Sequence, residues 1–370
     1  MDLQDLRRLP DVDGPGLAAS DAADRLILDE AAEYLATAPD GSVAVIDDAY
    51  GALALGSRAT TVRVHQDLVT GERALAANAA TFGVTDVRSL PFGSEVVDGA
   101  RVVLARLPRS LDRLAEAAAL IAATADDEVV VVAGGRIKHM SVAMNDVLRE
   151  YFDSVDVSHA RQKSRVLFAR GPRRGHAVER LAAWPHTQTH TDPAVIVAAH
   201  GGAFAGTRVD IGTRLLLGVL DVARPDADGI VDLACGTGVI AASLASARPS
   251  ASVLATDRSA LAVRSARATA DSNGVADRVR VEQADGLENV ADSSQDLIVL
   301  NPPFHSDAAL STGIAHHLFA DAARALAPGG ELWCVWNSHL AYRGSLGRIV
   351  GPTRQIVRNA KFTVTASTKL

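Results

Sequence analysis

The sequence contains little cysteine and no long apolar segment. Its two cysteines, Cys235 and Cys334, are far apart, and each lies in an apolar stretch. They provide neither a disulfide framework nor metal-ligand spacing, so we expect reduced thiols, no bound metal and a cytoplasmic protein. No apolar run reaches the roughly 18 residues that a membrane span requires, and residues 1–5 carry neither a basic region nor a signal-peptide core.

Positive charge is not in excess either. The formal net charge of −7 argues against a general nucleic-acid coat, although it leaves room for a local basic face. Hydrophobic residues make up 48% of the chain and charged residues 22%, as in an ordinary soluble globular protein. At 370 residues, the chain is long enough for two domains, each with its own core.

Short apolar segments alternate with helical stretches in both halves, which predicts α/β domains with mostly parallel sheets. Two segments rich in proline, glycine and polar residues, 171–175 and 184–189, interrupt this pattern. We therefore expect one domain at residues 1–175, a linker at 176–192 and a second domain at 193–370. The first half should contain strands at 43–46, 61–64, 102–107 and 128–133, helices at 75–82 and 111–123, and a hairpin around 155–157 and 165–169.

The second half carries a polar residue or a glycine turn at the end of successive predicted strands. The strand at 229–235 runs into Gly236 and Gly238, and glycines there allow a cofactor to approach the backbone and the following helix. Asp257, about 20 residues further on, is placed to bind ribose hydroxyls. Asp285 could bind an adenine amino group, and Asp232 could fix the loop or meet the ammonium group of an amino-acid cofactor.

A fourth strand, at 297–300, stops at Asn301-Pro302-Pro303-Phe304. Because the prolines forbid continuation of the sheet, they predict a stiff, extended turn with free carbonyl groups. The amide oxygen of Asn301 and the carbonyl of Pro302 are two acceptors that suit the two hydrogens of an exocyclic –NH2 group. Phe304 could then stack on the ring that carries the amine.

Nicotinamide binding is the main alternative for this half. However, Ala241 stands where a Gly-x-Gly-x-x-Gly loop has its third glycine, and a dehydrogenase gives no role to Asn301. S-adenosylmethionine accounts for both features, since its methyl group would lie between the glycine loop and Asn301.

These motifs resemble those of class I S-adenosylmethionine-dependent methyltransferases that act on exocyclic amines. More narrowly, and over nearly the whole chain, the sequence is similar to the ribosomal RNA guanine-N2 methyltransferases. The tail from Asn337 to Phe362 is more similar to the large-subunit branch of that family, from which it departs at Ser338. The resemblance is carried by 232–238, Asp257, Asp285, 301–305, Phe204, 210–214 and 336–340.

The resemblance implies two tandem Rossmann-like methyltransferase domains, of which the N-terminal one is degenerate. Consistent with a duplication, residues 62–66 parallel 253–257 and residues 104–108 parallel 300–303. Gln66 then replaces the ribose-binding acid and Arg106 replaces the asparagine, so the first domain should bind no S-adenosylmethionine. Phe204 and Gly212 could fold over the cofactor of the second domain or belong to a plain helix cap.

We expect ribosomal RNA or a ribosomal subunit as partner, no membrane association and a monomeric protein. The first domain should have an RNA-binding or structural role, because basic residues concentrate late in it and again near the C-terminus. The candidate RNA-binding residues are Arg136, Lys138, Arg161, Lys163, Arg165, Arg343, Arg358 and Lys361.

Three functions stay open on these grounds. The first is methyl transfer to the N2 amine of a guanine in ribosomal RNA, with the large subunit favoured and the small subunit possible. The second keeps the chemistry but changes the acceptor to an adenine amine or a protein glutamine amide. The third is a non-catalytic RNA-binding or assembly factor that retains a methyltransferase fold.

Overall fold

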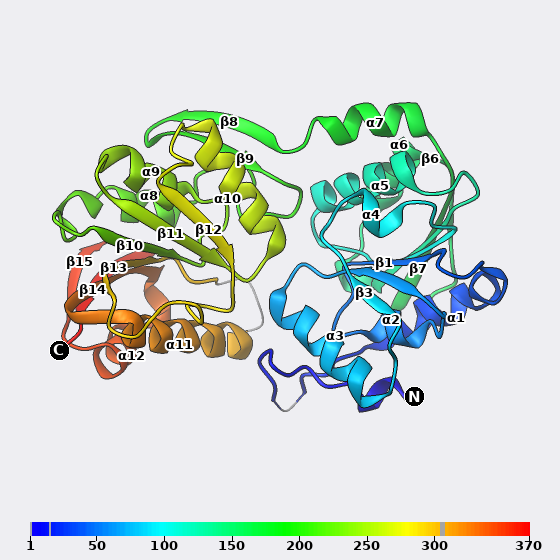
Figure 1. Ribbon diagram of the computed structural model, residues 1–370, viewed down its shortest axis with the longest axis horizontal. Helices are drawn as coiled ribbons and strands as arrows, with labels where there is room; N and C mark the ends of the chain where they lie inside the picture. The colour runs from blue at the N-terminus through cyan, green and yellow to red at the C-terminus, as the bar shows by residue number, and fades with distance from the viewer. Residues whose placement is uncertain (1, 15, 304–307) are drawn as a thin grey trace. The chain divides into compact units, whose positions relative to one another are not determined.

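The computed structural model describes residues 2–14, 16–303 and 308–370. The chain divides into two compact units, Met1–Trp184 and Pro185–Leu370, each built on its own seven-stranded sheet (Figure 1). Within the described residues, no helix is long and apolar enough to cross a membrane.

The sheet of the first unit has the strand order β3-β2-β1-β4-β5-β7-β6, in which β7 runs antiparallel to both of its neighbours. The helices are α1 (Ala22–Thr37), α2 (Ala52–Gly56), α3 (Val69–Thr81), α4 (Ser94–Val97), α5 (Leu111–Thr124), α6 (Ala143–Tyr151) and α7 (Arg174–Ala182), with short 3-10 turns η1 (Leu3–Asp5) and η2 (Ile137–His139). The strands are β1 (Val43–Ile46), β2 (Val62–His65), β3 (Val87–Ser89), β4 (Val102–Arg106), β5 (Val130–Arg136), β6 (Phe152–Val157) and β7 (Ser164–Pro172).

The second unit begins with a two-stranded hairpin and continues into the sheet β12-β11-β10-β13-β14-β16-β15. Its helices are α8 (Ile211–Leu217), α9 (Val239–Ala247), α10 (Ala260–Ser272), α11 (Ala308–Ala325) and α12 (Arg343–Ile349), with 3-10 turns η3 (Leu220–Val222) and η4 (Ser338–Leu340). Its strands are β8 (His186–Thr191), β9 (Ala194–Ala199), β10 (Gly229–Leu233), β11 (Ser252–Asp257), β12 (Val279–Gln283), β13 (Gln295–Leu300), β14 (Leu326–Asn337), β15 (Thr353–Arg358) and β16 (Phe362–Thr368).

The two large sheets have the same connectivity, which confirms the predicted pair of Rossmann-like domains. In the first unit Ile46 lies opposite both His65 and Ala105. In the second unit Leu233 lies opposite both Thr256 and Leu300. The next residue on each outer strand is therefore equivalent between the units, so Gln66 stands where Asp257 stands and Arg106 stands where Asn301 stands.

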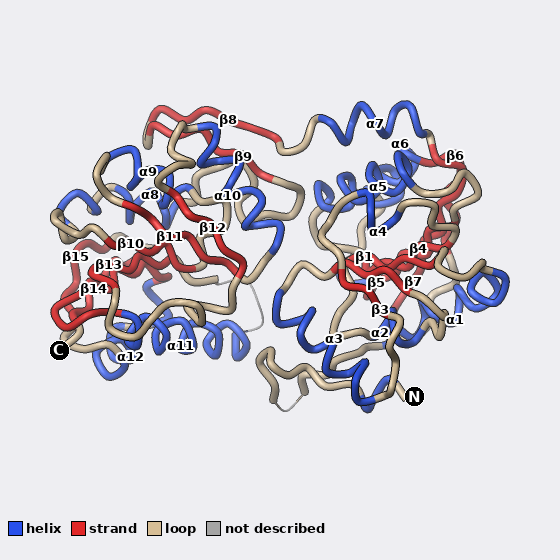
Figure 2. The backbone as a smooth tube through the Cα atoms, viewed as in Figure 1, coloured by secondary structure: helices blue, strands red, loops and turns tan. Residues whose placement is uncertain are grey.

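The central strands are buried on both faces, because helices cover each sheet on both sides (Figure 2). Strands of this kind are continuous apolar runs rather than alternating patterns. Residues 297–300 of β13 have no exposed surface, and Ile230 and Val231 of β10 are equally buried. The polar residues that follow these strands are thereby delivered to one rigid edge of the sheet.

The segment 176–192, where we expected a linker, contains most of α7 and all of β8, and the boundary between the two units, after Trp184, lies inside it. Helix α7 buries only Ala177, and residues 186–189 of β8 are exposed, so neither carries an apolar periodicity that the sequence could show. The strand β8 exists through its antiparallel pairing with β9. The glycines at 134–135, which follow the predicted strand at 128–133, are inside β5.

Candidate active site

The glycine turn after β10 is built on three residues with positive φ angles. Ala234, Gly236 and Gly238 have φ angles of 57°, 55° and 73°. A Cβ on Gly238 would lie 2.8 Å from the Cβ of Ala266, so only glycine lets the start of α9 pack this closely on α10. The turn leaves the first N–H groups of α9 at the carboxyl edge of the sheet.

Two carboxylates hold this turn. Asp257, at the end of β11, accepts hydrogen bonds from the N–H groups of Gly236 and Ser259, each at 2.9 Å. Asp232 is fully buried, and its Oδ2 accepts from Ala241 N at 2.9 Å. Within the described part of the chain, the other oxygen of Asp232, Oδ1, is buried with no hydrogen-bond partner. An acceptor of this kind suits a donor that arrives with a ligand.

Burial raises the pKa of Asp232 to about 7, and the negative charge of Asp257 acts in the same direction. Native Asp232 therefore keeps a proton that the unfolded chain releases above pH 3.8, so its contribution makes unfolding easier as pH rises toward 7. The expected decrease in the free energy of unfolding is at most about 4 kcal/mol. Asp232→Asn keeps an oxygen for Ala241 and cannot ionise.

We expect the stability of Asp232→Asn relative to wild type to increase between pH 5 and pH 7.5. Denaturant titrations of the ligand-free protein at the two pH values measure this difference. An equal difference at both values would contradict a neutral Asp232 in the native state.

The loop after β12 brings Asp285 to the same edge. The side chain is 23% exposed, and its Oδ1 lies 3.6 Å from Nε2 of His317 on α11. The contact with Asp285 raises the pKa of His317. Its neighbour His316 packs against Phe319 and Tyr342 and bonds Ser345.

Asn301 follows β13 directly and is anchored by its amide nitrogen. Nδ2 donates to Thr213 Oγ1 at 2.9 Å and to Asp210 Oδ2 at 3.3 Å. Its Oδ1 is buried, and no group among the described residues hydrogen-bonds to it. Pro302 is buried beside it. The predicted stacking residue Phe304 and the adjacent His305 lie outside the described residues.

The segment before α8 forms a helix cap that contacts Asn301. Asp210 is the N-cap and accepts from the N–H groups of Gly212 and Thr213. Gly212 is buried under this cap, whereas Phe204 is 43% exposed. The contact between Thr213 and Asn301 was missed, because a capping signal in sequence says nothing about which distant side chain shares the cap.

Most of the predicted RNA-binding residues have exposed side chains. Lys163 and Lys361 occupy equivalent places, since their carbonyl oxygens accept from Ile137 N in the first unit and Ser338 N in the second. Arg161 forms an ion pair with Asp29. Lys138, Arg165 and Arg358 are exposed, Arg343 is exposed and bonds Thr353 O, and Arg136 is half-buried.

The corresponding edge of the first unit is filled by its own side chains. Arg113 of α5 forms two hydrogen bonds to Asp47, at 2.8 and 2.5 Å, and lies 4.0 Å from the ring centroid of Phe92. His65, at the end of β2, lies 3.8 Å from Asp47 and packs against Phe92. Burial opposes ionisation of Asp47, but the guanidinium of Arg113 holds the pKa of this carboxyl below its ordinary value.

These four residues come from the loops after β1 and β3, the end of β2 and the first turn of α5. The second unit has its glycine turn, Asp257 and Asp285 in the corresponding segments. An ion pair with a buried guanidinium thus occupies the first unit where the second presents its polar edge. Arg106, the counterpart of Asn301, is itself paired with Asp24 at 3.2 Å.

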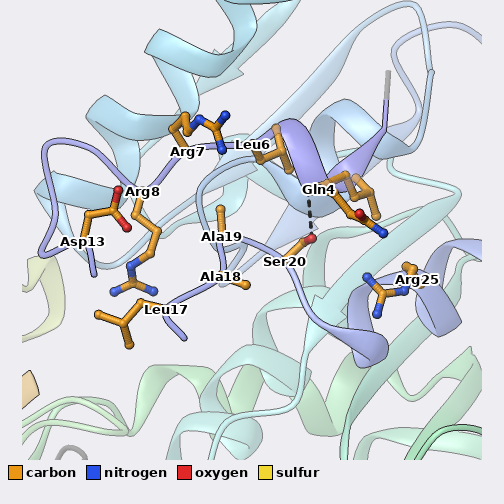
Figure 3. Close-up of a pocket in the computed structure, with 11 residues that line it drawn as sticks. Gln4, Leu6, Arg7, Arg8, Asp13, Leu17, Ala18, Ala19, Ser20 and Arg25 are labelled. Carbon is orange, nitrogen blue, oxygen red and sulfur yellow. Dashed lines mark hydrogen bonds between the residues drawn. The ribbon is translucent and has the colours of Figure 1, made fainter. Parts of the chain in front are cut away.

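The first unit also has a pocket of about 430 Å³, which Figure 3 shows in close-up. Its described lining residues all lie between Leu3 and Arg25, before the first strand of this unit. This pocket is therefore not the counterpart of the edge that carries Asn301.

Comparisons with known proteins also divide the chain into two domains. Residues 194–366 match the family described as methyltransferase small domain, and residues 2–173 match the RLMG N-terminal domain. The ribosomal RNA large subunit methyltransferase G of Streptomyces coelicolor is 33% identical, over 98% of this chain and 97% of the relative. The protein of the same name from Pseudomonas aeruginosa is 34% identical, over 97% and 96%.

A solved structure shares the fold of the whole chain. The 16S rRNA N2 G1207 methyltransferase of T. Thermophilus, in complex with AdoMet and guanosine, superposes with a TM-score of 0.74. It is 19% identical and covers 97% of each chain, so both Rossmann-like units are present in the same order. With full-length relatives above 30% identity and two matched domain families, the chain belongs to the family of the ribosomal RNA large subunit methyltransferase G proteins.

Proposed function

We propose that this protein transfers a methyl group from S-adenosylmethionine to the N2 amine of a guanine in ribosomal RNA, with large-subunit RNA as the substrate. The family assignment supports the methyltransferase activity, and the names of the relatives favour the large subunit. One observation carries the proposal. Asn301 Oδ1 is a buried acceptor with no partner among the described residues, and it lies at the same edge of the sheet as the glycine turn.

The residues of the second unit fit the cofactor. When bound, S-adenosylmethionine supplies an electrophilic methyl group on a positively charged sulfur. Asp232 presents Oδ1, which has no partner among the described groups, to the cofactor's ammonium, whose positive charge favours the ionised carboxylate. Asp257 holds the glycine turn and faces the ribose position, and Asp285 lies on the next loop, where adenine is expected.

Asn301 and Pro302 are proposed to bind the acceptor amine. Asn301 Oδ1 and the carbonyl oxygen of Pro302 each accept one amine hydrogen, which directs the nitrogen lone pair away from both oxygens. Catalysis is then mainly positioning, and the same oxygens stabilise the positive charge that grows on nitrogen. Phe304 is proposed to stack on the base. The guanine must be unpaired, because its amine is not reachable within a stacked duplex.

The other two functions make different predictions for one experiment. Ribosomal particles and RNA from a strain lacking this protein are incubated with the purified protein and tritiated S-adenosylmethionine, and the labelled nucleosides are then identified. We expect label in N2-methylguanosine of large-subunit RNA. Label in adenosine or in protein glutamine would show the second function. Cofactor binding without transfer to any ribosomal substrate would show the third.

Basic residues at one edge of each unit are proposed to contact RNA phosphates. We expect Lys163→Glu with Lys361→Glu to weaken RNA binding and to reduce the salt dependence of the association constant, by a slope of about 0.7 to 0.9 per lost phosphate contact. Binding is measured at several salt concentrations.

Arg180→Glu is the matched control, since Arg180 is exposed but pairs with Glu150 on α6. An unchanged salt slope in the double variant would refute phosphate contact at these two lysines.

A further inference from the structure

The orientation of the Asn301 amide is set by two side chains from the first turn of α8. Asp210 Oδ2 receives three donors: Gly212 N at 2.8 Å, Thr213 N at 3.1 Å and Asn301 Nδ2 at 3.3 Å. Thr213 Oγ1 accepts from the same Nδ2 at 2.9 Å. Both acceptors lie about 90 residues before Asn301 in the sequence, and the cap itself fixes the carboxylate.

A carboxylate can accept hydrogen bonds but cannot donate them, so it selects the –NH2 end of the amide. Asn301 Oδ1 must then point away from Asp210 and Thr213. That oxygen is buried and has no partner within the described segments, a costly arrangement for a carbonyl group in the absence of a ligand. The two observations fit together: one end of the amide is doubly bound, and the other end is kept for a donor.

We infer that Asp210 and Thr213 are positioning residues that turn the amide oxygen of Asn301 toward the acceptor amine. This inference rests on the proposed function. The negative charge of Asp210 also polarises the amide, which increases the electron density on Oδ1. The same arrangement makes the site selective for amino groups, because a rotated amide would present its own –NH2 to the substrate amine.

Gly212, which lies between Asp210 and Thr213, contributes to this arrangement. A Cβ on Gly212 would lie 3.0 Å from Asp210 Oδ2 and 3.1 Å from the ring of Phe362. A side chain at residue 212 would displace the carboxylate that accepts a hydrogen bond from Asn301. Glycine at this position therefore allows the Asp210 side chain to fold back over the first turn of α8.

Helix capping alone is the competing explanation, and five substitutions separate it from positioning. Asp210→Ser keeps an effective N-cap but is too short to reach Asn301. Asp210→Asn keeps both the cap and the acceptor while removing the charge. Thr213→Val removes the hydroxyl acceptor at nearly constant volume, and Thr213→Ser restores it. Asp21→Ser makes the same capping change at α1 of the first unit, where Asp21 is the N-cap.

The experiment measures kcat at saturating S-adenosylmethionine, the Kd of the cofactor, and thermal stability, for each variant of the full chain. We expect kcat to fall about 10-fold in Asp210→Ser and in Thr213→Val, and about 100-fold in the double variant that combines these two substitutions. Asp210→Asn should lose no more than about fivefold, because only polarisation is lost. Thr213→Ser and Asp21→Ser should keep wild-type kcat, and the cofactor Kd should stay within about twofold throughout.

Three results would overturn the inference. One is wild-type kcat in the double variant. Another is weakened cofactor binding at unchanged kcat. The third is an equal loss of kcat in Asp21→Ser and Asp210→Ser, which would assign the effect to capping. If the wild-type protein transfers no methyl group to guanine, the proposed function fails; if it does and the double variant is equally active, only this inference fails.

Discussion

Asn301→Ala is expected to lower kcat by about 100-fold or more and to change the affinity for S-adenosylmethionine by less than about threefold. The side chain supplies one of the two proposed acceptors for the amine, and its contribution grows as positive charge develops on nitrogen. It has no part in the glycine turn, whose hydrogen bonds come from Asp232 and Asp257. Single-turnover rates at saturating cofactor, with cofactor titrations alongside, measure the two quantities separately.

Asn301→Gln is the matched control that separates the presence of the amide group from its position. It keeps the amide but moves it by one methylene group, away from Asp210 and Thr213, so kcat should fall nearly as far as in the alanine variant. Turnover close to wild type in either variant would remove Asn301 from the mechanism. Lost cofactor affinity with normal residual turnover would reverse the roles that we assign to Asn301 and Asp257.

The second large effect is expected at the cofactor. Asp257→Ala should weaken S-adenosylmethionine binding by about 100-fold or more, because it removes the proposed contact to the ribose hydroxyls and frees Gly236 and Ser259 from their acceptor. Isothermal titration of the full chain should give one site in the wild-type protein and no measurable site in this variant.

Gln66→Ala is the matched control, since Gln66 occupies the equivalent strand end of the first unit. It should leave both affinity and stoichiometry unchanged, because Asp47, Arg113 and Phe92 fill that edge. Two sites in the wild-type protein, or one site that survives Asp257→Ala, would contradict a degenerate first unit.

Central strands could be predicted well from the sequence. Strands β1, β10 and β13 are short apolar runs bounded by turn residues, and burial on both faces requires that composition. Elements at the surface could not be predicted in the same way. Helix α7 and strand β8 are polar, and their conformations depend on neighbours that no local pattern reveals.

The same distinction applies to the site. Asp257 and Asn301 could be located because they end apolar strands, and parallel strands bring their carboxyl ends to one edge. The partners of Asn301 and Asp285 come from elsewhere in the chain. Thr213 and His317 lie in helices, and the pairing of Asp47 with Arg113 spans 66 residues. Such contacts arise from tertiary packing, so a sequence motif alone cannot show them.

The most direct test is a crystal structure of the protein with guanosine and a non-reactive analogue of S-adenosylmethionine. We predict the analogue on the glycine turn of the second unit, and the guanosine N2 at hydrogen-bond distance, about 2.7 to 3.2 Å, from Asn301 Oδ1. An analogue bound in the first unit, or an Asn301 amide that turns its nitrogen toward the base, would contradict this account.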